Sequence, residues 1–314
     1  MPAFTASAPG KIILFGEHAV VYGQPAIAIP VTQVCAKATV TPKIKEDSKQ
    51  VQVLAPDVGL DSSLEDLPSE HPIGAAIKRV ISVLKVDHLP TCTIKITSTI
   101  PVASGLGSGA AVSVAVIRAL AGFLGQPLPD EEVSALAYEI EKIHHGTPSG
   151  IDNTVVTYAQ PVYFVKGQLV ETFEVAEPFT ILIADTGIPA LTKESVSDVR
   201  VAWQADPKTY ERWFAAAGSI AKTARQAIES GHPEWLGPLM NENHELLQEM
   251  GVSSPELDHL VRTAKESGAW GAKLSGGGRG GNMITLVETH QAETIAKKLQ
   301  TAGAVHTITT TVER

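Results

Sequence analysis

Apolar and polar residues alternate in many short stretches of the first half of the chain, and longer stretches with helical spacing lie between them. Alternation with a period of two indicates strands, whereas apolar residues that recur every three or four positions indicate amphipathic helices. Glycines and prolines separate most of these stretches and mark turns. The elements predicted for this half are strands over 12–15, 26–31, 34–40, 51–54 and 91–100, helices over 71–86, 108–124 and 130–145, and a hairpin over 154–172.

Helical spacing dominates the second half, with short apolar stretches before and after the helices. Helices and strands occur in both halves, which predicts an α+β fold. A length of 314 residues suggests two domains, and the change in character along the chain predicts domains over 1–175 and 176–314. The elements predicted here are strands over 180–184, 272–274, 282–287 and 306–312, and helices over 193–205, 208–230, 233–250, 255–267 and 290–302.

The composition is that of a globular protein, with 44% hydrophobic and 19% charged residues. A formal net charge of −9 argues against a nucleic-acid partner, which requires a basic surface. The longest apolar stretch, 109–125, contains Arg118 and many small residues, so it predicts a buried helix and no membrane association. Cys35 and Cys92 form no disulfide or metal-binding pattern, and the N-terminus shows no secretory signal. We therefore expect a cytoplasmic protein.

A glycine-rich segment over 101–111 follows a predicted strand and leads into an apolar helix. Glycines let the backbone approach a ligand, and the N–H groups of a first helical turn attract anions, so the arrangement favours phosphate binding. A tight structural turn is the simplest alternative. The segment consists of Pro101, Val102, Ala103, Ser104, Gly105, Leu106, Gly107, Ser108, Gly109, Ala110 and Ala111.

Two other glycine-rich nucleotide loops fit this segment less well. A dinucleotide-binding loop is disfavoured because four residues separate the strand from Gly105, and because no acidic residue ends a following strand. A P-loop is excluded because no Gly-Lys-Ser/Thr sequence follows. The remaining interpretation is phosphate binding of a third kind.

Polar residues flank the first predicted strand. Lys11 lies at its beginning, and Glu17 and His18 follow its end. Polar side chains on loops that a rigid scaffold holds are typical of functional sites. A solvated lysine and a surface histidine are the ordinary alternatives for each residue taken alone.

A second polar cluster follows the helix predicted over 130–145. Asp152 is expected in a turn before a strand, either as a catalytic carboxylate or as a local cap of the turn. A zinc site at His144 and His145 is disfavoured, because adjacent residues do not share a helix face and no third ligand has matching spacing.

Five glycines and Arg279 occupy positions 276–281 between two short predicted strands. A simple hairpin needs only one or two glycines, so the segment indicates close approach to a ligand or to another loop. Arg279 either reaches a phosphate or a substrate carboxylate, or is a solvated arginine on the loop.

Three motifs occur in a fixed order: Pro-Gly-Lys followed by Gly-Glu-His over 9–18, Gly-Leu-Gly-Ser-Gly-Ala over 105–110, and Leu-Ser-Gly-Gly-Gly over 274–278. Together they resemble the three motifs of the GHMP kinases, over about residues 8–287. The resemblance implies an N-terminal α/β domain with a mixed sheet, a C-terminal ferredoxin-like α+β domain, and an active site in the cleft between them.

Segments 16–23, 145–153 and 186–193 resemble the branch of the family that acts on mevalonate. The resemblance implies transfer of the γ-phosphoryl group of ATP to the primary hydroxyl of (R)-mevalonate, giving 5-phosphomevalonate for isoprenoid biosynthesis. The alternatives are a GHMP kinase for phosphomevalonate or another small alcohol, and a ligand sensor without catalysis. An oxidoreductase is the least favoured alternative.

The resemblance also implies roles for single residues. Asp152 matches the catalytic aspartate that accepts the proton of the attacking hydroxyl, and Lys11 matches the lysine that keeps this carboxylate ionised. Glu141 and Ser108 match the Mg²⁺ ligands, although many relatives carry a second serine where this chain has Gly109.

For the two substrates, the resemblance implies contacts of mevalonate with Glu17, His18, Ser149 and Thr192. ATP is expected to bind the segment over 101–111 together with Gly276 and Gly277. Relatives are often homodimers that prenyl diphosphates inhibit, so both properties are expectations for this chain.

Overall fold

The chain, described here by a computed structural model, divides into two compact units whose segments interleave along the sequence. Strands β1 and β2 each begin in one unit and end in the other. The first unit contains Met1–Gly10, Val34–Val102 and Gly107–Ala159, and the second contains Lys11–Gln33, Ala103–Leu106 and Gln160–Arg314. The structure describes residues 2–43, 51–68, 70–101, 104–145, 148–190 and 192–313, without the side chains of residues 144 and 145.

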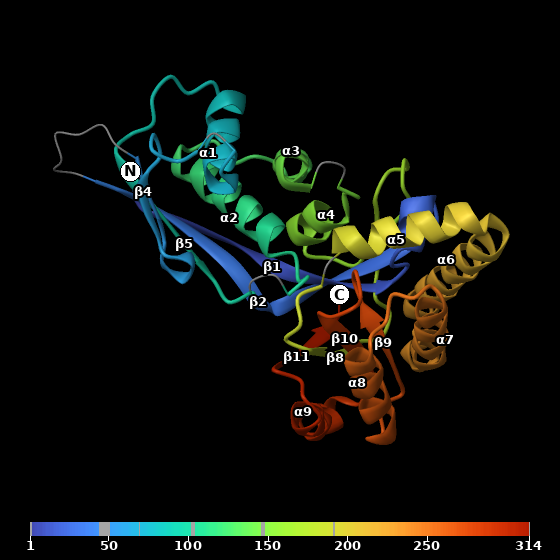
Figure 1. Ribbon diagram of the computed structural model, residues 1–314. Helices are drawn as coiled ribbons and strands as arrows, with labels where there is room; N and C mark the ends of the chain where they lie inside the picture. Colours follow the sequence, from blue (N-terminus) through green and yellow to red (C-terminus); the bar gives the residue numbers. More distant parts are fainter. Residues whose placement is uncertain are drawn as a thin grey trace. The chain divides into compact units, whose positions relative to one another are not determined.

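The first unit combines one part of a mixed sheet with four helices (Figure 1). Its strands follow the order β4-β3-β5-β2, in which β3 and β5 are parallel and the other pairs are antiparallel. Its elements are the first part of β1 (Phe4–Phe15) and the last part of β2 (Ala26–Pro42), then β3 (Val51–Ala55), β4 (Leu60–Ser63), α1 (Pro72–Val83), β5 (Cys92–Ser98), α2 (Ser108–Phe123), α3 (Asp130–His145) and α4 (Ile151–Tyr158).

Helix α2 is the centre of the first unit's core. It packs against α1, α3, α4 and β5, and most of its residues are buried. Many of them are alanines, which allow neighbouring helices to approach closely. Arg118 is its one charged residue, and its Nη2 donates to Oδ1 of Asp130 at 2.7 Å and to the carbonyl oxygen of Thr157 at 2.6 Å. The guanidinium therefore joins α2 to the start of α3 and the end of α4.

The second unit contains a four-stranded antiparallel sheet in the order β11-β8-β10-β9. Helices α7 and α8 pack on β9 and β10, and α9 packs on β8 and β11. Its elements are the remaining parts of β1 and β2, then β6 (Val162–Phe164), β7 (Glu171–Thr172), β8 (Phe179–Asp185), α5 (Thr192–Ala205), α6 (Pro207–Glu229), α7 (Leu236–Glu249), α8 (Pro255–Glu266), β9 (Gly271–Ser275), β10 (Asn282–Val287), α9 (Ala292–Thr301) and β11 (His306–Val312), with 3-10 turns at Ala19–Tyr22, Pro233–Trp235 and Thr289–Gln291.

The sequence explains where the helices of the second unit begin. The side chain of Asp206 accepts from the backbone N–H of Thr209 at 3.3 Å and caps α6, and Ser254 caps α8 in the same way. A proline follows each cap at the first helical position, where its missing N–H costs nothing. All residues of β9 and β10 are buried, and these include the polar residues Lys273 and Asn282.

Most of the predicted helices and strands are confirmed, with ends that shift by a few residues, but the strand predicted over 12–15 begins much earlier, at Phe4. The separate strands predicted over 26–31 and 34–40 are wrong, because they form one continuous strand, β2. The polar pair Thr32 and Gln33 between them is exposed and does not interrupt the strand. Strand β4 was not predicted.

The hairpin predicted over 154–172 is also wrong in its first half. Residues Ile151–Tyr158 form α4, and only β6 and β7 pair as a hairpin. Thr154, Val155, Val156 and Thr157 are β-branched and favour a strand locally. Packing of α4 against α2 and α3 outweighs this preference.

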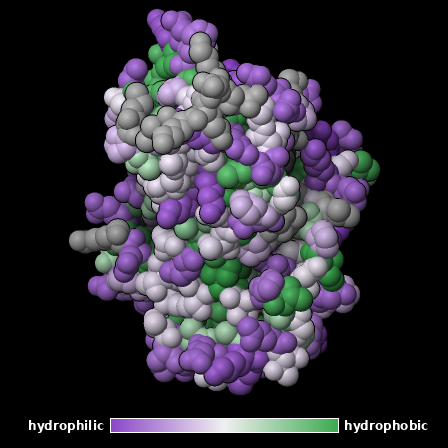
Figure 2. All heavy atoms as spheres, turned by 90° about the vertical axis from the view of Figure 1, so that its left-hand side faces the viewer, coloured by the Kyte–Doolittle hydropathy of each residue, from purple (hydrophilic) through white to green (hydrophobic). Residues whose placement is uncertain are grey.

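On the face shown in Figure 2, hydrophilic side chains surround hydrophobic residues that lie in separate groups. In the described part of the chain, no helix combines the length and the apolar character that a membrane crossing requires.

Candidate active site

The glycine-rich segment over 101–111 leads directly into helix α2. Gly105 and Gly107 have φ angles of 75° and 73°, in the left-handed region that favours glycine. Gly107 is the N-cap of α2, and no side-chain hydrogen bond caps this helix end. Its first N–H groups are therefore available to an anionic ligand.

Backbone contacts fix the described part of the loop that precedes α2. The backbone N–H of Lys11 donates to the carbonyl oxygen of Leu106 at 2.9 Å. Nδ2 of Asn282 donates to the carbonyl oxygen of Ser104. The loop is thus attached to β1 and β10 of the second unit. Val102 and Ala103, which belong to the predicted phosphate loop, lie outside the described residues.

Three predicted site residues of the first unit lie on helices that pack against one another. Ser108 is the first residue of α2, Glu141 lies in the last turns of α3, and Asp152 lies in the first turn of α4. All three side chains are half-buried. Helices α2, α3 and α4 contact each other pairwise, so the first unit holds these oxygen-bearing side chains on one helical cluster.

Asp152 was expected in a turn before a strand, and this expectation is wrong. It lies in the first turn of α4, whose N-cap is Gly150 with a φ angle of 89°. Because Gly150 is the N-cap, the alternative that Asp152 caps the helix is wrong. A carboxylate in the first turn interacts favourably with the helix dipole. Ser149, before the helix, is exposed.

The residue after Asp152 anchors its helix. Asn153 is buried, and its Nδ2 donates to Oγ of Ser134 at 2.8 Å and to the carbonyl oxygen of Ser134 at 3.2 Å. Thr154 adds a hydrogen bond from its Oγ1 to the carbonyl oxygen of Gly150 at 2.7 Å. These contacts fix α4 against α3, and therefore fix the direction in which Asp152 leaves the helix.

In the second unit, three buried polar residues lie within β1 or shortly after its end. Lys11, Glu17 and His18 are 6%, 1% and 5% exposed. The alternatives of a solvated lysine and a surface histidine are therefore wrong. Glu17 forms an ion pair with Lys273, whose side chain is completely buried on β9. Burial lowers the pKa of Lys273, and the carboxylate of Glu17 opposes this shift.

His18 is held in one orientation and in its neutral form. Its Nε2 lies 3.1 Å from the carbonyl oxygen of Gly277, and burial lowers its pKa to about 4. A neutral imidazole must donate from Nε2 to this oxygen, so its Nδ1 is an acceptor. Neither Nδ1 of His18 nor Oε2 of Glu17 has a hydrogen-bond partner among the described residues. The two atoms belong to consecutive residues, and both are buried acceptors.

The glycine-rich loop over 276–281 is packed closely against neighbouring segments of the second unit. A Cβ atom at Gly277 would lie 2.6 Å from Oγ1 of Thr192, and one at Gly278 would lie 1.9 Å from the carbonyl oxygen of Val252. The sequence predicted that this segment lies close to a ligand or to another loop, and its close approach to another loop is confirmed. Thr192, the first residue of α5, lies directly against this loop.

Arg279 has a structural environment of its own. Its Nη1 forms an ion pair with Asp198 on α5, and its Nε donates to the carbonyl oxygen of Gly251 at 3.2 Å. Its φ angle of 58° is unusual for a residue other than glycine. The side chain is thus neither a simple solvated arginine nor an obvious phosphate ligand.

Oxygen donors in the first unit fit a hard cation. Mg²⁺ prefers oxygen ligands and usually takes one or two protein groups, with water and substrate phosphates completing its coordination. The hydroxyl of Ser108 and the carboxylate of Glu141 have this chemistry. In the described ranges, no group of three or more His, Cys, Asp or Glu side chains could hold a metal ion.

Sequence reasoning missed two residues of this site. Lys273 occurs in the short apolar segment Gly-Ala-Lys-Leu-Ser, and a lysine inside a fully buried strand is a signal that could have identified it. Asn153 is the neighbour of the predicted Asp152, but its role in holding α4 depends on a helix that the pattern did not predict.

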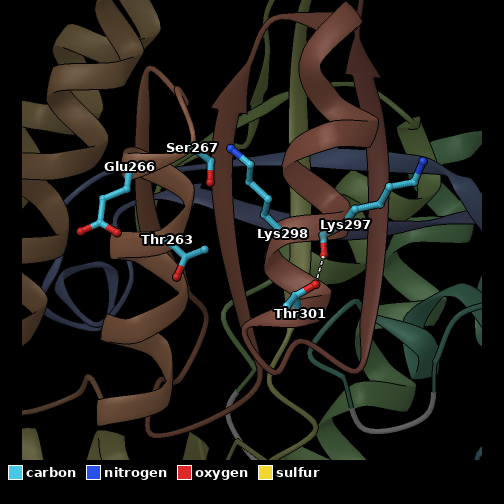
Figure 3. A pocket seen from close by; sticks show the side chains of 6 residues that line it. All are labelled: Thr263, Glu266, Ser267, Lys297, Lys298 and Thr301. Carbon is cyan, nitrogen blue, oxygen red and sulfur yellow. Dashed lines mark hydrogen bonds between the residues drawn. The ribbon is translucent and has the colours of Figure 1, made fainter.

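A shallow hollow between α8 and α9 is separate from these residues (Figure 3). The side chains of Lys297 and Lys298 extend from it in opposite directions, so they do not form a common anion site. Lys297 instead pairs with Glu293 at 2.7 Å, and its carbonyl oxygen accepts from Thr301. The lining residues are Thr263, Glu266, Ser267, Lys297, Lys298 and Thr301.

Comparison with known proteins connects the two glycine-rich segments to one family. The model of the GHMP kinases N terminal domain matches residues 74–160, and that of the GHMP kinases C terminal domain matches residues 224–305. Together the two matches cover more than half of the chain. The chain belongs to the GHMP kinase family. The expected GHMP kinase fold is thereby confirmed, and the protein is an enzyme, a kinase.

The relatives of this GHMP kinase include mevalonate kinases of similar length. It is 36% identical to a mevalonate kinase of Thermococcus sibiricus over 97% of this chain and 95% of the relative. It is 37% identical to a mevalonate kinase of Pyrococcus horikoshii, over 97% of this chain and 94% of the relative. A crystal structure of L. major mevalonate kinase in complex with R-mevalonate superposes with a TM-score of 0.84 at 31% identity, covering 98% of this chain and 95% of that one.

Proposed function

We propose that this GHMP kinase transfers the γ-phosphoryl group of ATP to the primary hydroxyl of (R)-mevalonate, giving 5-phosphomevalonate and ADP in isoprenoid biosynthesis. The observation that carries the proposal is the likeness to mevalonate kinases over 97% of the chain. The two buried acceptors at Glu17 and His18 support it, because they suit a substrate with hydroxyl groups.

Asp152 and Lys11 are proposed as the catalytic pair. The hydroxyl oxygen of mevalonate attacks the γ-phosphorus, the bond from this phosphorus to the β,γ-bridging oxygen breaks, and ADP leaves with the electron pair. The hydroxyl proton passes to the carboxylate of Asp152. Its place in the first turn of the anchored helix α4 supports this role. Lys11 stabilises negative charge on Asp152 and on the transferring group.

The segment over 101–111, with Gly276 and Gly277, is proposed to bind the phosphates of ATP. Uncapped N–H groups at the start of α2 support this role, because they attract negative charge. Ser108 and Glu141 are proposed to hold magnesium, which neutralises phosphate charge when it is bound. Gly109 has no hydroxyl, so Ser108 is the serine assigned to the metal.

The alcohol is proposed to contact Glu17, His18, Ser149 and Thr192. Glu17 and His18 accept hydrogen bonds from its hydroxyl groups through the two atoms that lack partners in the described structure. Thr192 is proposed to contact the transferring phosphoryl group, which its position against the loop at Gly277 supports.

A substrate panel tests the function. ADP release is measured with mevalonate, phosphomevalonate, homoserine and galactose, each with ATP and magnesium. Mevalonate should be turned over with a kcat/KM far above that of the other three alcohols. Absence of turnover with mevalonate would refute the proposed substrate, and turnover with phosphomevalonate alone would favour the alternative GHMP kinase.

A homodimer and inhibition by prenyl diphosphates are proposed from the resemblance to the family, and a two-domain division at residue 175 and a cytoplasmic location are proposed from the sequence pattern and composition. The last is supported by Cys35 and Cys92, which are unpaired. Light scattering measures the oligomeric state, and titration with farnesyl diphosphate at fixed mevalonate concentration measures the inhibition.

A further inference from the structure

We propose that Lys273 is a positioning residue for the alcohol substrate, because its buried ammonium orients Glu17 and His18 for substrate binding. The proposal rests on the proposed function, in which those two residues contact the alcohol. Lys273 acts through Glu17 and does not touch the reacting atoms.

Three cross-links join the end of β1 to β9 and the glycine-rich loop after it, and we call them the β1–β9 clasp. All of them lie within the second unit. They fix both the strand end and the loop, so the polar side chains between them have little freedom. The cross-links are the hydrogen bond from Oγ of Ser275 to the carbonyl oxygen of Ile13 at 2.7 Å, the ion pair between Lys273 and Glu17, and the contact of Nε2 of His18 with the carbonyl oxygen of Gly277 at 3.1 Å.

Lys273 is the charged member of the clasp. Its side chain is 0% exposed, and its Nζ donates to Oε1 of Glu17 and to the carbonyl oxygen of Leu274, the latter at 2.6 Å. Nζ also lies 6.0 Å from the ring centre of Phe15. Two acceptors in fixed positions define the direction of the ammonium, and through it the direction of the Glu17 carboxylate.

Stability alone is a weak reason for a buried ion pair, because well-packed apolar residues of similar volume are often at least as stable. We therefore interpret the ion pair with Lys273 as a contact that fixes the direction of the Glu17 carboxylate. The ion pair engages Oε1 of Glu17 and leaves Oε2 without a partner among the described residues. In the same way, the contact with the carbonyl oxygen of Gly277 engages Nε2 of His18 and leaves Nδ1 without a partner there. Both acceptors are buried on consecutive residues, where a ligand that donates hydrogen bonds would satisfy them.

Replacement of Lys273 by methionine tests this role, because methionine keeps an unbranched apolar side chain and removes the ammonium. Lys273→Met should raise the KM for mevalonate and lower kcat, reducing kcat/KM for mevalonate by about 10²-fold, the size expected for misplaced substrate. The KM for ATP should stay unchanged. Lys297→Met is the matched control, since its ion pair with Glu293 on α9 is exposed, and it should change neither constant.

A purely structural role makes a different prediction. Lys273→Met would then lower the unfolding temperature, while the folded fraction kept the KM for mevalonate of the wild type, and this result would overturn the proposal. If the methionine variant does not fold, Lys273→Gln keeps a donor in place and is measured in the same way. Failure of both to fold would make Lys273 a structural residue and overturn the proposal as well.

An NMR readout separates this proposal from the proposed function. In the wild type, the ¹⁵N signals of His18 should report the tautomer with hydrogen on Nε2, and Lys273→Met should lose this single state. If wild-type enzyme fails to phosphorylate mevalonate, the proposed function fails, but the His18 signals still test the clasp. Unchanged His18 signals in Lys273→Met would overturn the role of Lys273.

Discussion

At the scale of single residues, burial determines the chemistry of the polar groups at the end of β1. Glu17 and His18 were predicted as a functional pair from their neighbourhood in the sequence, and both are buried in the structure. The sequence could not reveal that Lys273 neutralises Glu17, because the two residues are 256 positions apart. Single residue types indicate chemistry, whereas the partner of a buried charge depends on tertiary contacts.

The stability of the protein should fall in mild acid because of His18. Burial lowers its pKa from 6.5 to about 4, so the unfolded chain binds a proton at pH values where the folded protein does not. The contribution of neutral His18 to the free energy of unfolding is fully present above about pH 6.5 and is lost as the pH falls toward 4. This loss amounts to about 3 kcal/mol. Burial gives His244 a pKa of about 4 as well, so it adds a loss of the same sign.

Urea unfolding at pH 7.5 and pH 4.5 measures this effect. His18→Gln should show a smaller loss of stability between the two pH values than the wild type, whereas replacement of the exposed His306 by Gln should leave the loss unchanged. An identical pH dependence in His18→Gln and the wild type would contradict the assignment.

Asp152 should determine the rate of the chemical step. Asp152→Asn keeps the size of the side chain and removes the base, so kcat should fall by about 10²–10⁴. The KM values for both substrates should change far less. Steady-state kinetics on the folded variant measure both constants, and a kcat near that of the wild type would show that another group accepts the proton.

At the scale of helices and strands, periodic patterns were reliable where local sequence and packing agree. Helices α6 and α8 combine helical spacing with a capping residue and a proline at the first position, and both were predicted nearly to their ends. Helix α4 was missed, because its β-branched residues favour a strand and only contacts with α2 and α3 select the helix. The secondary structure predicted around Asp152 was therefore wrong. Its selection as a site residue did not depend on that prediction, because it came from the motif.

Asn153 should contribute strongly to the stability of the first unit. Asn153→Ala removes the two hydrogen bonds that the buried amide group donates to Ser134, which should lower the free energy of unfolding by about 1–3 kcal/mol. Thr223→Ala, at an exposed hydrogen bond within α6, should change it by less than about 0.5 kcal/mol. Chemical unfolding compares the two variants, and equal stabilities would show that the Asn153 anchor is dispensable.

Two glycines of the loop over 276–281 allow the cost of a positive φ angle to be distinguished from the cost of a steric clash between an added Cβ atom and its neighbours. Gly276 and Gly278 have φ angles of 86° and 74°, but a Cβ atom meets nothing at Gly276 and would lie 1.9 Å from a carbonyl oxygen at Gly278. Gly276→Ala should cost about 1–2 kcal/mol from strain. Gly278→Ala should cost about 1–3 kcal/mol more, because the backbone of Val252 must move.

Thermal and urea unfolding of the two alanine variants supply these values. A cost at Gly278 no larger than at Gly276 would mean that the loop moves freely away from Val252.

At the scale of the whole molecule, the chain interleaves its segments between two compact units. The sequence indicated two domains, but a linear pattern does not reveal that β1 and β2 pass from one unit to the other. The order of three short motifs over most of the chain was enough to predict the family, which the matches to both GHMP kinase domains confirm. Each motif alone left several functions open.

The identity of the phosphorylated product decides whether the protein phosphorylates mevalonate at its primary hydroxyl. Purified protein is incubated with ATP, magnesium and (R)-mevalonate, and the products are followed by ³¹P NMR. We expect one new phosphomonoester signal, coupled to the C5 methylene protons, that grows in equal amount with ADP and is nearly absent with Asp152→Asn. ADP formed with inorganic phosphate alone, or an ester at the C3 hydroxyl, would contradict it.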